Sequence, residues 1–214
     1  MGEGGDGRMA ILSGEQSLVS TLQSAITLFR ANLSTFVPDI FGFETMQAQS
    51  EIMQWWGNAN SSMVIQEGFT NRPVQGLSWN VTIGVEQEII KRQPIGQGGV
   101  SGALQTQMTD FDSSYIVACL GPNKDWLRWS QMLCKWALLY YRQALLQQYG
   151  LMQQKLSLGP LQPIPDDLRD AVKFQYMRTV TLTAQHIDSW NLLAVPVITS
   201  AGVSVDPNFV EMEV

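Results

Sequence analysis

The hydrophobic pattern of residues 123–149 predicts one long helix. Its apolar side chains recur every three or four residues, which places them on two stripes of a helix. The first stripe is Trp126, Trp129, Leu133, Trp136 and Tyr140, and the second is Leu127, Cys134, Leu138, Tyr141 and Leu145. Asn123 is a suitable N-cap, Asp125 lies in the positive first turn, and Gly150 supplies a left-handed end. We therefore expect the chain's own sheet to cover one stripe and something else to cover the other.

Alternation of apolar and polar residues predicts the strands of that sheet. The clearest alternation begins at Leu77, and we expect its strand to pair as a hairpin with a second strand that contains residues 115–119. A third strand is half-buried, and Arg178 interrupts its apolar face, at a bulge or at the exposed end of the sheet. A last segment contains Pro196 and is typical of an edge strand or an arm. The expected strands lie near residues 79–90, 112–120, 172–187 and 192–199.

Helices and breaks fill the rest of the chain. Residues 13–33 predict an N-terminal helix, because their apolar side chains recur at helical spacing. Pro38 and Gly42 are expected to break the chain, and residues 44–56 to form a short helix that ends at Gly57. Residues 156–170 contain three prolines and predict a stiff, exposed connection back to the sheet.

Along the chain, hydrophobic residues recur at every second position, then at every third or fourth position, and then again at every second position. The first spacing is typical of strands and the second of helices, so their succession predicts an α+β fold. We expect an α/β sandwich, in which a mainly antiparallel sheet packs on one long central helix, with an N-terminal helix and extended arms. Residues 13–205 are expected to form a single domain with a projecting loop at 91–102. Residues 1–12 are expected to be a flexible arm, and residues 206–214 an acidic, amphipathic tail.

Composition narrows the classes of function. The chain has 214 residues, of which 45% are hydrophobic, so it has enough apolar side chains for a core. Only 15% are charged, against about 25% in an average soluble domain, and a polar but uncharged surface costs less to bury against a neighbour. The net charge of −6 argues against general binding to the nucleic-acid backbone. No apolar run approaches the ~18 residues that span a bilayer, and no signal peptide is visible, so we expect a cytoplasmic chain that makes no membrane contact.

Residues with catalytic or ligand chemistry are few. Cys119 and Cys134 lie in apolar segments and are expected in the core, and a single histidine leaves no basis for a structural zinc site. His186 and Asp188 would point to the same side of a strand, but no motif with a nucleophile accompanies them. Paired aspartates at 110 and 112 and at 166 and 167 lie in loop-like sequence, where aspartate is common in turns. We therefore expect no enzyme activity, cofactor or metal.

Three segments are candidates for contacts with other subunits. Trp55 and Trp56 form a large apolar pair beside a loop, either at the edge of the core or as an interface anchor. The Gly-rich loop at 91–102 lacks a phosphate-binding motif and is interpreted as a partner-binding arm. The segment after Pro196 has strand-like composition. The candidate interface residues are Trp55, Trp56, Pro94, Ile95, Gly98, Gly99, Val100, Val197 and Ile198.

The order of these elements resembles the tail terminator and head-to-tail neck proteins of tailed bacteriophages. The resemblance rests on the helix at 13–33, the hairpin with its loop at 77–121, the helix at 123–149 and the strands at 172–205, and on low charge with abundant Gln, Ser and Thr. It implies a homo-oligomeric ring, commonly a hexamer, that caps the tail tube and joins it to the head.

The implied partners are the chain itself, the tail tube and the neck or connector proteins, and DNA would pass through the ring without sequence-specific binding. The implied location is the virion, after assembly in the host cytoplasm. Two alternatives stay open at this point. The chain could be another neck, connector or tail-tube subunit, or it could be a non-viral oligomeric scaffold or an uncharacterised enzyme.

Overall fold

The computed structural model describes residues 14–58, 61, 63–68, 76–88, 100–101, 104–164 and 176–193. The chain divides into two compact units. The larger contains residues 1–89 and 110–186, and the smaller contains residues 90–109 and 187–214. The single domain expected over 13–205 stays a prediction. The two terminal arms lie outside the described residues.

The described residues confirm the α+β class, with helices against a mainly antiparallel sheet. The helices are α1 (Gly14–Ala31), α2 (Leu33–Phe41), α3 (Met46–Gly57), α4 (Lys124–Tyr140) and α5 (Arg142–Tyr149). The strands are β1 (Met63–Glu67), β2 (Leu77–Glu88), β3 (Val100–Ser101), β4 (Leu104–Leu120), β5 (Met152–Leu158), β6 (Gln162–Pro163) and β7 (Tyr176–Leu193).

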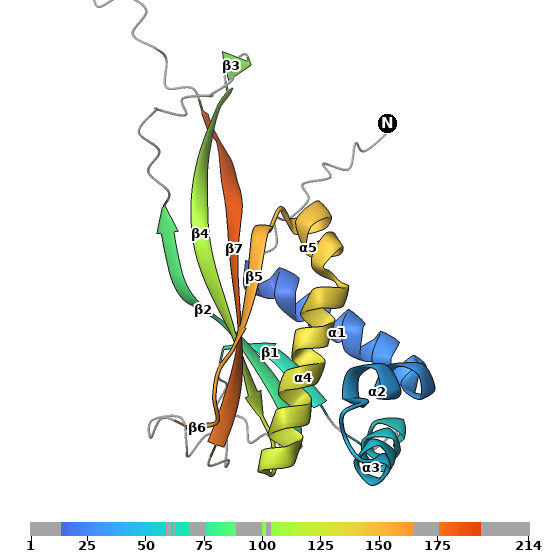
Figure 1. Ribbon diagram of the computed structural model, residues 1–214. Helices are drawn as coiled ribbons and strands as arrows, with labels where there is room; N and C mark the ends of the chain where they lie inside the picture. Colours follow the sequence, from blue (N-terminus) through green and yellow to red (C-terminus); the bar gives the residue numbers. More distant parts are fainter. Residues whose placement is uncertain are drawn as a thin grey trace, which may run out of the picture. The chain divides into compact units, whose positions relative to one another are not determined.

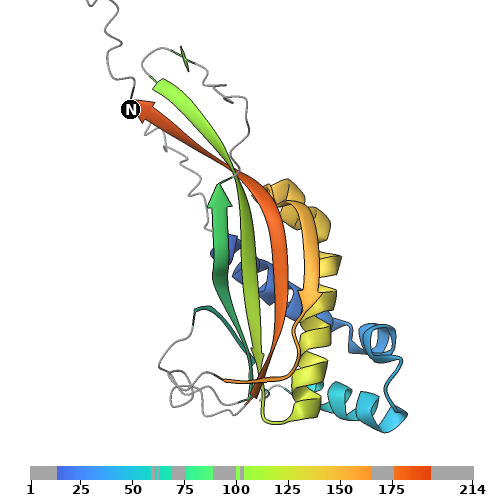
Figure 2. The same cartoon turned by 60° about the vertical axis from the view of Figure 1, so that its left-hand side comes forward.

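The strands form one sheet in the order β1-β2-β4-β7-β5, with β3 paired to β4 and β6 paired to β7. The expected hairpin is confirmed, because β2 and β4 are antiparallel neighbours, and β5 and β6 also pair antiparallel with β7. Only β1 pairs in parallel with its neighbour among the described pairs. In the larger unit, all the helices lie on one face of this sheet (Figures 1 and 2).

The long helix predicted over 123–149 is wrong in one respect, because it consists of two helices that meet at Tyr141. Both predicted ends are confirmed: the Asn123 side chain accepts a hydrogen bond from the Trp126 amide, and Gly150 closes α5 with a φ of 67°. Next to the break, the chain is bonded to β5. Arg142, the first residue of α5, donates to the Gln154 carbonyl, and the Gln154 amide donates back to the Arg142 carbonyl. These bonds tie α5 to the sheet.

The sheet packs on one of the two apolar stripes predicted for α4, and other helices of the same chain pack on the second stripe. On the sheet side, Trp79 Nε1 donates to Ser130 Oγ at 2.8 Å. On the other side, the ring of Trp136 lies 6.0 Å from that of Phe29 in α1 and 4.9 Å from that of Phe36 in α2. Cys119 and Cys134 are both buried free thiols, as predicted.

The break predicted at Pro38 is wrong, because Pro38 lies inside α2. Pro38 removes one helical hydrogen bond, but it lies on the exposed side of the helix, where water can satisfy the carbonyl that is left free. Gly42 does follow the end of α2. A Cβ at Gly42 would lie 2.6 Å from the Pro38 carbonyl oxygen, so this close return of the chain needs a glycine.

The strand predicted from Leu77 is confirmed as β2, but burial does not follow its alternation. Residues 77–81 are all buried, Ser78 and Asn80 included, whereas Ile83 and Val85 are 39% and 63% exposed. The register of β2 shifts between Ile83 and Val85. The Ile83 amide at this irregularity donates to the Glu15 carboxylate in the first turn of α1, at 2.9 Å. The start of α1 is thereby fixed to the sheet.

In its first part, the connection predicted over 156–170 is wrong, because residues 156–158 belong to β5 and Gln162–Pro163 form β6. Its predicted exposure holds for Ser157, Leu158 and Pro160. β7 confirms the predicted third strand from Tyr176 onward, with Val180, Leu182 and Ala184 buried. Arg178 lies near the start of β7, where its guanidinium donates to Gln131 Oε1 at 3.3 Å. Residues 165–175 and 194–199 lie outside the described residues.

Trp56 belongs to the core, so we expect Trp56→Ala to lower the free energy of unfolding by about 3–5 kcal/mol. The side chain is 4% exposed, its ring meets that of Phe29 edge to face at 5.4 Å, and the Arg30 guanidinium lies 5.3 Å above it. Denaturant titration measures the change. Trp55→Ala is the matched control, and because Trp55 is only half-buried it should cost clearly less. Equal losses at the two positions would contradict this assignment.

Burial raises the pKa of the Cys134 thiol, and the neighbouring Cys119 raises it further. The folded protein therefore holds this proton more tightly than the unfolded chain, whose thiol pKa is about 8.5. The resulting stabilisation is complete below pH ~8.5 and is lost as the pH rises from there towards the folded-state pKa.

We expect the free energy of unfolding to fall above pH ~8.5 by at most about 1.4 kcal/mol per pH unit from this one thiol. Cys134→Ala should cost stability at pH 7 but show a flatter decline between pH 8.5 and 9.5. Urea titrations at several pH values test the comparison. Parallel pH profiles for the two proteins would show that another group causes the decline.

Candidate interaction surfaces

The structure places only some of the predicted interface residues. Trp55 and Trp56 end α3, and both have partners within their own chain: the Trp55 ring lies 5.1 Å from the Trp126 ring, and Trp56 is in the core. Of the two alternatives left open for this pair, these contacts favour a position in and beside the core. Val100 lies in β3. The remaining candidates, Pro94, Ile95, Gly98, Gly99, Val197 and Ile198, lie outside the described residues.

His186 has a structural position. Its Nδ1 lies 3.2 Å from the Ser113 hydroxyl, and its ring stacks on Phe111 with centroids 5.6 Å apart. Ser113 is fully buried, so its hydroxyl is closed to an external substrate. The cluster therefore links β4 to β7. In the described part of the chain, no group of three or more His, Cys, Asp or Glu side chains is arranged to hold a metal ion.

Within the described residues, no strand pairs with the outer edge of β5 along residues 155–158. Ser157 pairs with Thr181, and the Gly159 amide donates to the Thr179 carbonyl, so this alternation directs the backbone groups of Leu156 and Leu158 away from β7. No hydrogen bond from another described residue reaches those outward groups. An open edge of this kind is a template for pairing with another strand.

The opposite edge of the sheet, at β1, is partly covered. Gln23 of α1 donates to the Ile65 carbonyl at 3.4 Å. The Gly68 amide continues the pairing of β1 with Val81 of β2. The two edges of the sheet are therefore different, and β5 is the more accessible of the two within the described residues.

An aromatic surface lies where α4 ends. The half-buried rings of Phe36 and Trp136 support the Tyr140 ring, whose centroid is 6.1 Å from that of Phe36 and 5.2 Å from that of Trp136. Tyr140 is 54% exposed, and its neighbour Leu139 is 46% exposed. We call these four residues the elbow patch. Aromatic side chains held in place by others are typical of interface hot spots.

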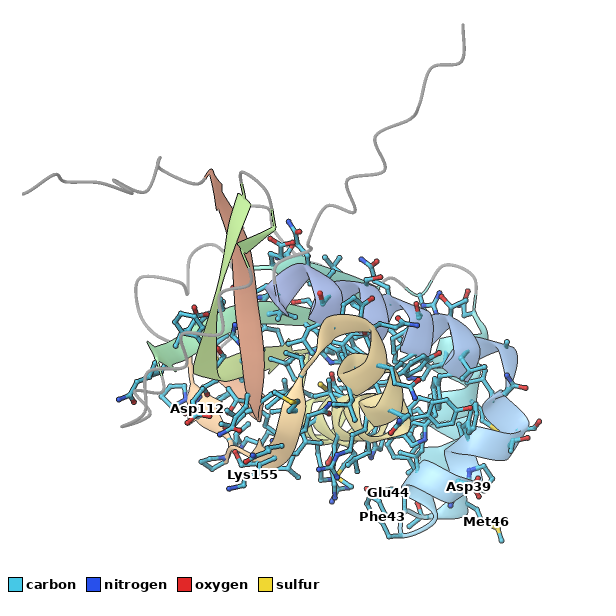
Figure 3. All side chains as sticks on the ribbon, turned by 90° about the horizontal axis from the view of Figure 1, so that it is seen from above. Asp39, Phe43, Glu44, Met46, Asp112 and Lys155 are labelled. Carbon is cyan, nitrogen blue, oxygen red and sulfur yellow. The ribbon has the colours of Figure 1, made fainter. Side chains whose placement is uncertain are left out.

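A second apolar surface lies at the turn between α2 and α3. Phe43 is 60% exposed and Met46 is 89% exposed. Figure 3 shows both side chains at this corner, with Asp39 and Glu44 beside them and with Lys155 and Asp112 at a distance on the sheet. Glu44 is held by Arg128 of α4, with Oε1 2.6 Å from Nη2. The ion pair fixes the corner against α4.

Sequence reasoning missed these surfaces for identifiable reasons. Tyr140 fits the apolar stripe of a helix, and only the position of α2 shows that the stripe extends past its cover. Phe43 follows Gly42 in a turn, where a large apolar residue has no local partner, and that was an available signal. The open edge of β5 had no usable signal, because β5 itself was not predicted.

The described part of the chain is thus an α+β sandwich with two exposed apolar surfaces and an open sheet edge. None of its helices is long and apolar enough to cross a membrane.

No protein-family model matches this chain, and no curated protein matches it. Among solved structures, it is similar to a chain from the cryo-EM structure of an extracellular contractile injection system, described as "PVC sheath/tube terminator in extended state". The TM-score is 0.36 and the sequence identity is 10%. The match covers 80% of this chain, which spans 65% of the length of the other.

If the elbow patch is a contact surface, Tyr140→Ser should weaken self-association and leave the monomer folded, because the side chain is more than half exposed. An interface tyrosine of this kind contributes about 2 kcal/mol to binding. Sedimentation velocity over a range of concentrations measures the association. Gln143→Ser on the exposed side of α5 is the control and should change nothing. Unchanged association of Tyr140→Ser would remove the patch from the interface.

Proposed function

We propose that this protein is a non-enzymatic structural subunit of a homo-oligomeric ring, and that the ring terminates a tail tube and joins it to the head or neck of a virion. One observation carries the proposal of a ring. The chain presents different association surfaces on different sides of the same unit: the open edge of β5 and the apolar corner at Phe43 and Met46.

Different surfaces are what a ring requires. A dimer with two-fold symmetry uses the same patch twice, whereas a ring joins one surface of each subunit to a different surface of the next. In the larger unit the corner lies on the helical side, while the open edge belongs to the sheet (Figure 3). A head-to-tail contact between such surfaces repeats from subunit to subunit, and it forms a closed ring when the rotation between neighbours closes and a filament when it does not.

The composition of the surface supports the same proposal. The outer face of β5 and β7, opposite the helices, carries Ser157, Thr181 and Thr183 with the single charge of Lys155. Uncharged polar side chains cost less to bury against a neighbour than charged ones do. The tube-terminating role, the sixfold order and the passage of DNA come from the resemblance of the element order to phage terminator and neck proteins.

We expect light scattering of the purified chain to give one oligomer of defined stoichiometry, and negative-stain images to show rings. Mixed with its tail tube, the protein should cap one end of each tube. A protein that stays monomeric at micromolar concentrations would contradict the ring. Rings that stack between other neck components, or that polymerise into tubes, would instead identify a connector or tail-tube subunit.

A further inference from the structure

A series of aromatic rings in contact runs through the helices of the larger unit. It begins with Trp129 and Trp126 of α4, whose ring centroids lie 5.0 Å apart. The Trp126 ring lies 5.1 Å from that of Trp55 in α3, and the Trp55 ring lies 4.7 Å from that of Trp56. These spacings are within the ~4.5–7 Å typical of aromatic pairs. We call these four residues the tryptophan group.

The series continues from the tryptophan group to the surface. The Phe29 ring of α1 lies 5.4 Å from that of Trp56 and 6.0 Å from that of Trp136. The Trp136 ring in turn lies 5.2 Å from that of Tyr140. Trp56 is 4% exposed, whereas Tyr140 is 54% exposed. The rings therefore form a continuous path from the tryptophan group to a tyrosine side chain in contact with solvent.

Such a path is suited to the movement of single electrons. Among aromatic side chains, the indole of tryptophan and the phenol of tyrosine lose an electron most readily, and electron transfer becomes steeply slower as the gap between two rings widens. Phe29 is the one member of the path that does not lose an electron readily, and it contacts a tryptophan on each side. A missing electron in the tryptophan group can therefore be replaced by an electron from Tyr140.

The protons at the two ends of the path favour this direction. The indole N–H of Trp129 is buried and has no hydrogen-bond acceptor within the described part of the chain. An oxidised indole normally loses this proton, which traps the radical there, and the missing acceptor hinders that loss. At Tyr140 the exposed side chain lets water take the phenolic proton as the electron leaves. Oxidation is therefore retained poorly at Trp129 and well at Tyr140.

We propose that this path carries one-electron oxidation from the tryptophan group to Tyr140 and so protects the core. A one-electron oxidant, such as an oxygen-centred radical, takes one electron from a tryptophan, and the half-buried Trp55 is the most accessible member of the group. The resulting radical cation takes one electron from Tyr140 through the rings between them. Tyr140 releases its phenolic proton to water and becomes a neutral tyrosyl radical.

A soluble thiol or ascorbate completes the cycle, because it returns one electron and one proton to the tyrosyl oxygen. The tryptophan is then restored without a new covalent bond, whereas a tryptophan radical left in the core reacts irreversibly with oxygen. This function goes beyond the proposed structural role and does not depend on a ring.

Photo-oxidation of the full-length chain tests the path. Light at the red edge of the tryptophan absorption excites tryptophan but not tyrosine, and a soluble cobalt(III) ammine complex takes up the electron and is reduced to cobalt(II). Transient absorption then follows the tryptophan radical and the tyrosyl radical separately. We expect the tyrosyl signal to grow as the tryptophan signal decays.

Tyr140→Phe should remove most of the tyrosyl signal, because phenylalanine keeps the ring but has no phenolic proton to release. Tyr176→Phe is the matched control, because Tyr176 is 40% exposed and its ring is not a member of the path. This control should leave the tyrosyl signal unchanged. Circular dichroism confirms that both variants are folded.

Oxidation products locate the radical when the path is interrupted. Trypsin places Trp126, Trp129 and Tyr140 on three different peptides. Mass spectrometry should find more oxidised Trp126 and Trp129 in Tyr140→Phe than in the unchanged protein. Trp136→Phe should have the same effect, because the electron from Tyr140 must then cross two successive phenylalanine rings.

The outcomes separate this inference from the proposed function. A tyrosyl signal that Tyr140→Phe leaves unchanged, or that Tyr176→Phe lowers equally, would overturn the inference. Equal oxidation of Trp126 and Trp129 with the path intact and interrupted would also overturn it. None of these measurements depends on assembly. A monomeric protein with transfer to Tyr140 would support the path and contradict the ring, and a ring without this transfer would do the reverse.

Discussion

The Gln131 side chain joins α4 to the sheet at the point where three segments meet. Its Nε2 donates to the carbonyls of Gly159 and Thr179, at 2.8 and 2.7 Å, and its Oε1 accepts from Arg178. A buried amide left without partners would cost about 1–3 kcal/mol, so this position is stable only with β7 and the turn after β5 in place. Gly159 is part of the constraint, because a Cβ there would overlap the Thr179 hydroxyl.

The consequence of this constraint is that α4 has a fixed rotation about its own axis. With Gln131 and Ser130 directed at the sheet, Trp126 and Trp136 turn towards α3 and α2. The remaining face is then only partly covered: Met132 packs against the core and Arg128 pairs with Glu44, whereas Leu139 is 46% exposed. The exposure of Leu139 and Tyr140 is therefore a result of how the core is built, because the elements that pack on α4 leave the side chains at its end exposed.

The sequence predicted those parts of the fold that depend only on a residue and its close neighbours along the chain. Asn123 and Gly150 define the ends of the α4 and α5 region because a cap needs only its own few neighbours. The break at Tyr141 was not predictable in that way. Beside it, Arg142 of α5 is bonded to Gln154 of β5, a strand that shows no clear alternation and whose Gln153 adopts a left-handed φ of 48°.

The candidate interaction surfaces were less predictable than the fold. The exposure of a side chain depends on which elements from elsewhere in the chain pack beside it. Trp56 and Tyr140 are both large aromatic residues in apolar stripes, yet Trp56 is 4% exposed and Tyr140 is 54% exposed. What separates them is the position of α1 and α2, which no local pattern encodes. For the same reason the sequence identified a tryptophan pair, a Gly-rich loop and the segment after Pro196 as interface candidates, whereas the surfaces that the structure describes lie at the end of α4, at the turn between α2 and α3 and on a strand edge.

The polar face of α1 shows how a surface with few charges can be prepared for burial. Ser24 donates to the Ser20 carbonyl and Thr27 donates to the Gln23 carbonyl, so these hydroxyl donors are already satisfied by their own helix. Together with Leu28 and Ala31 they line a shallow hollow along α1. A neighbour placed against this hollow would displace water without leaving those donors unpaired, which removes the largest cost of burying a polar face. The low charge of the chain is therefore compatible with stable solvation as a free subunit and with close contact in an assembly.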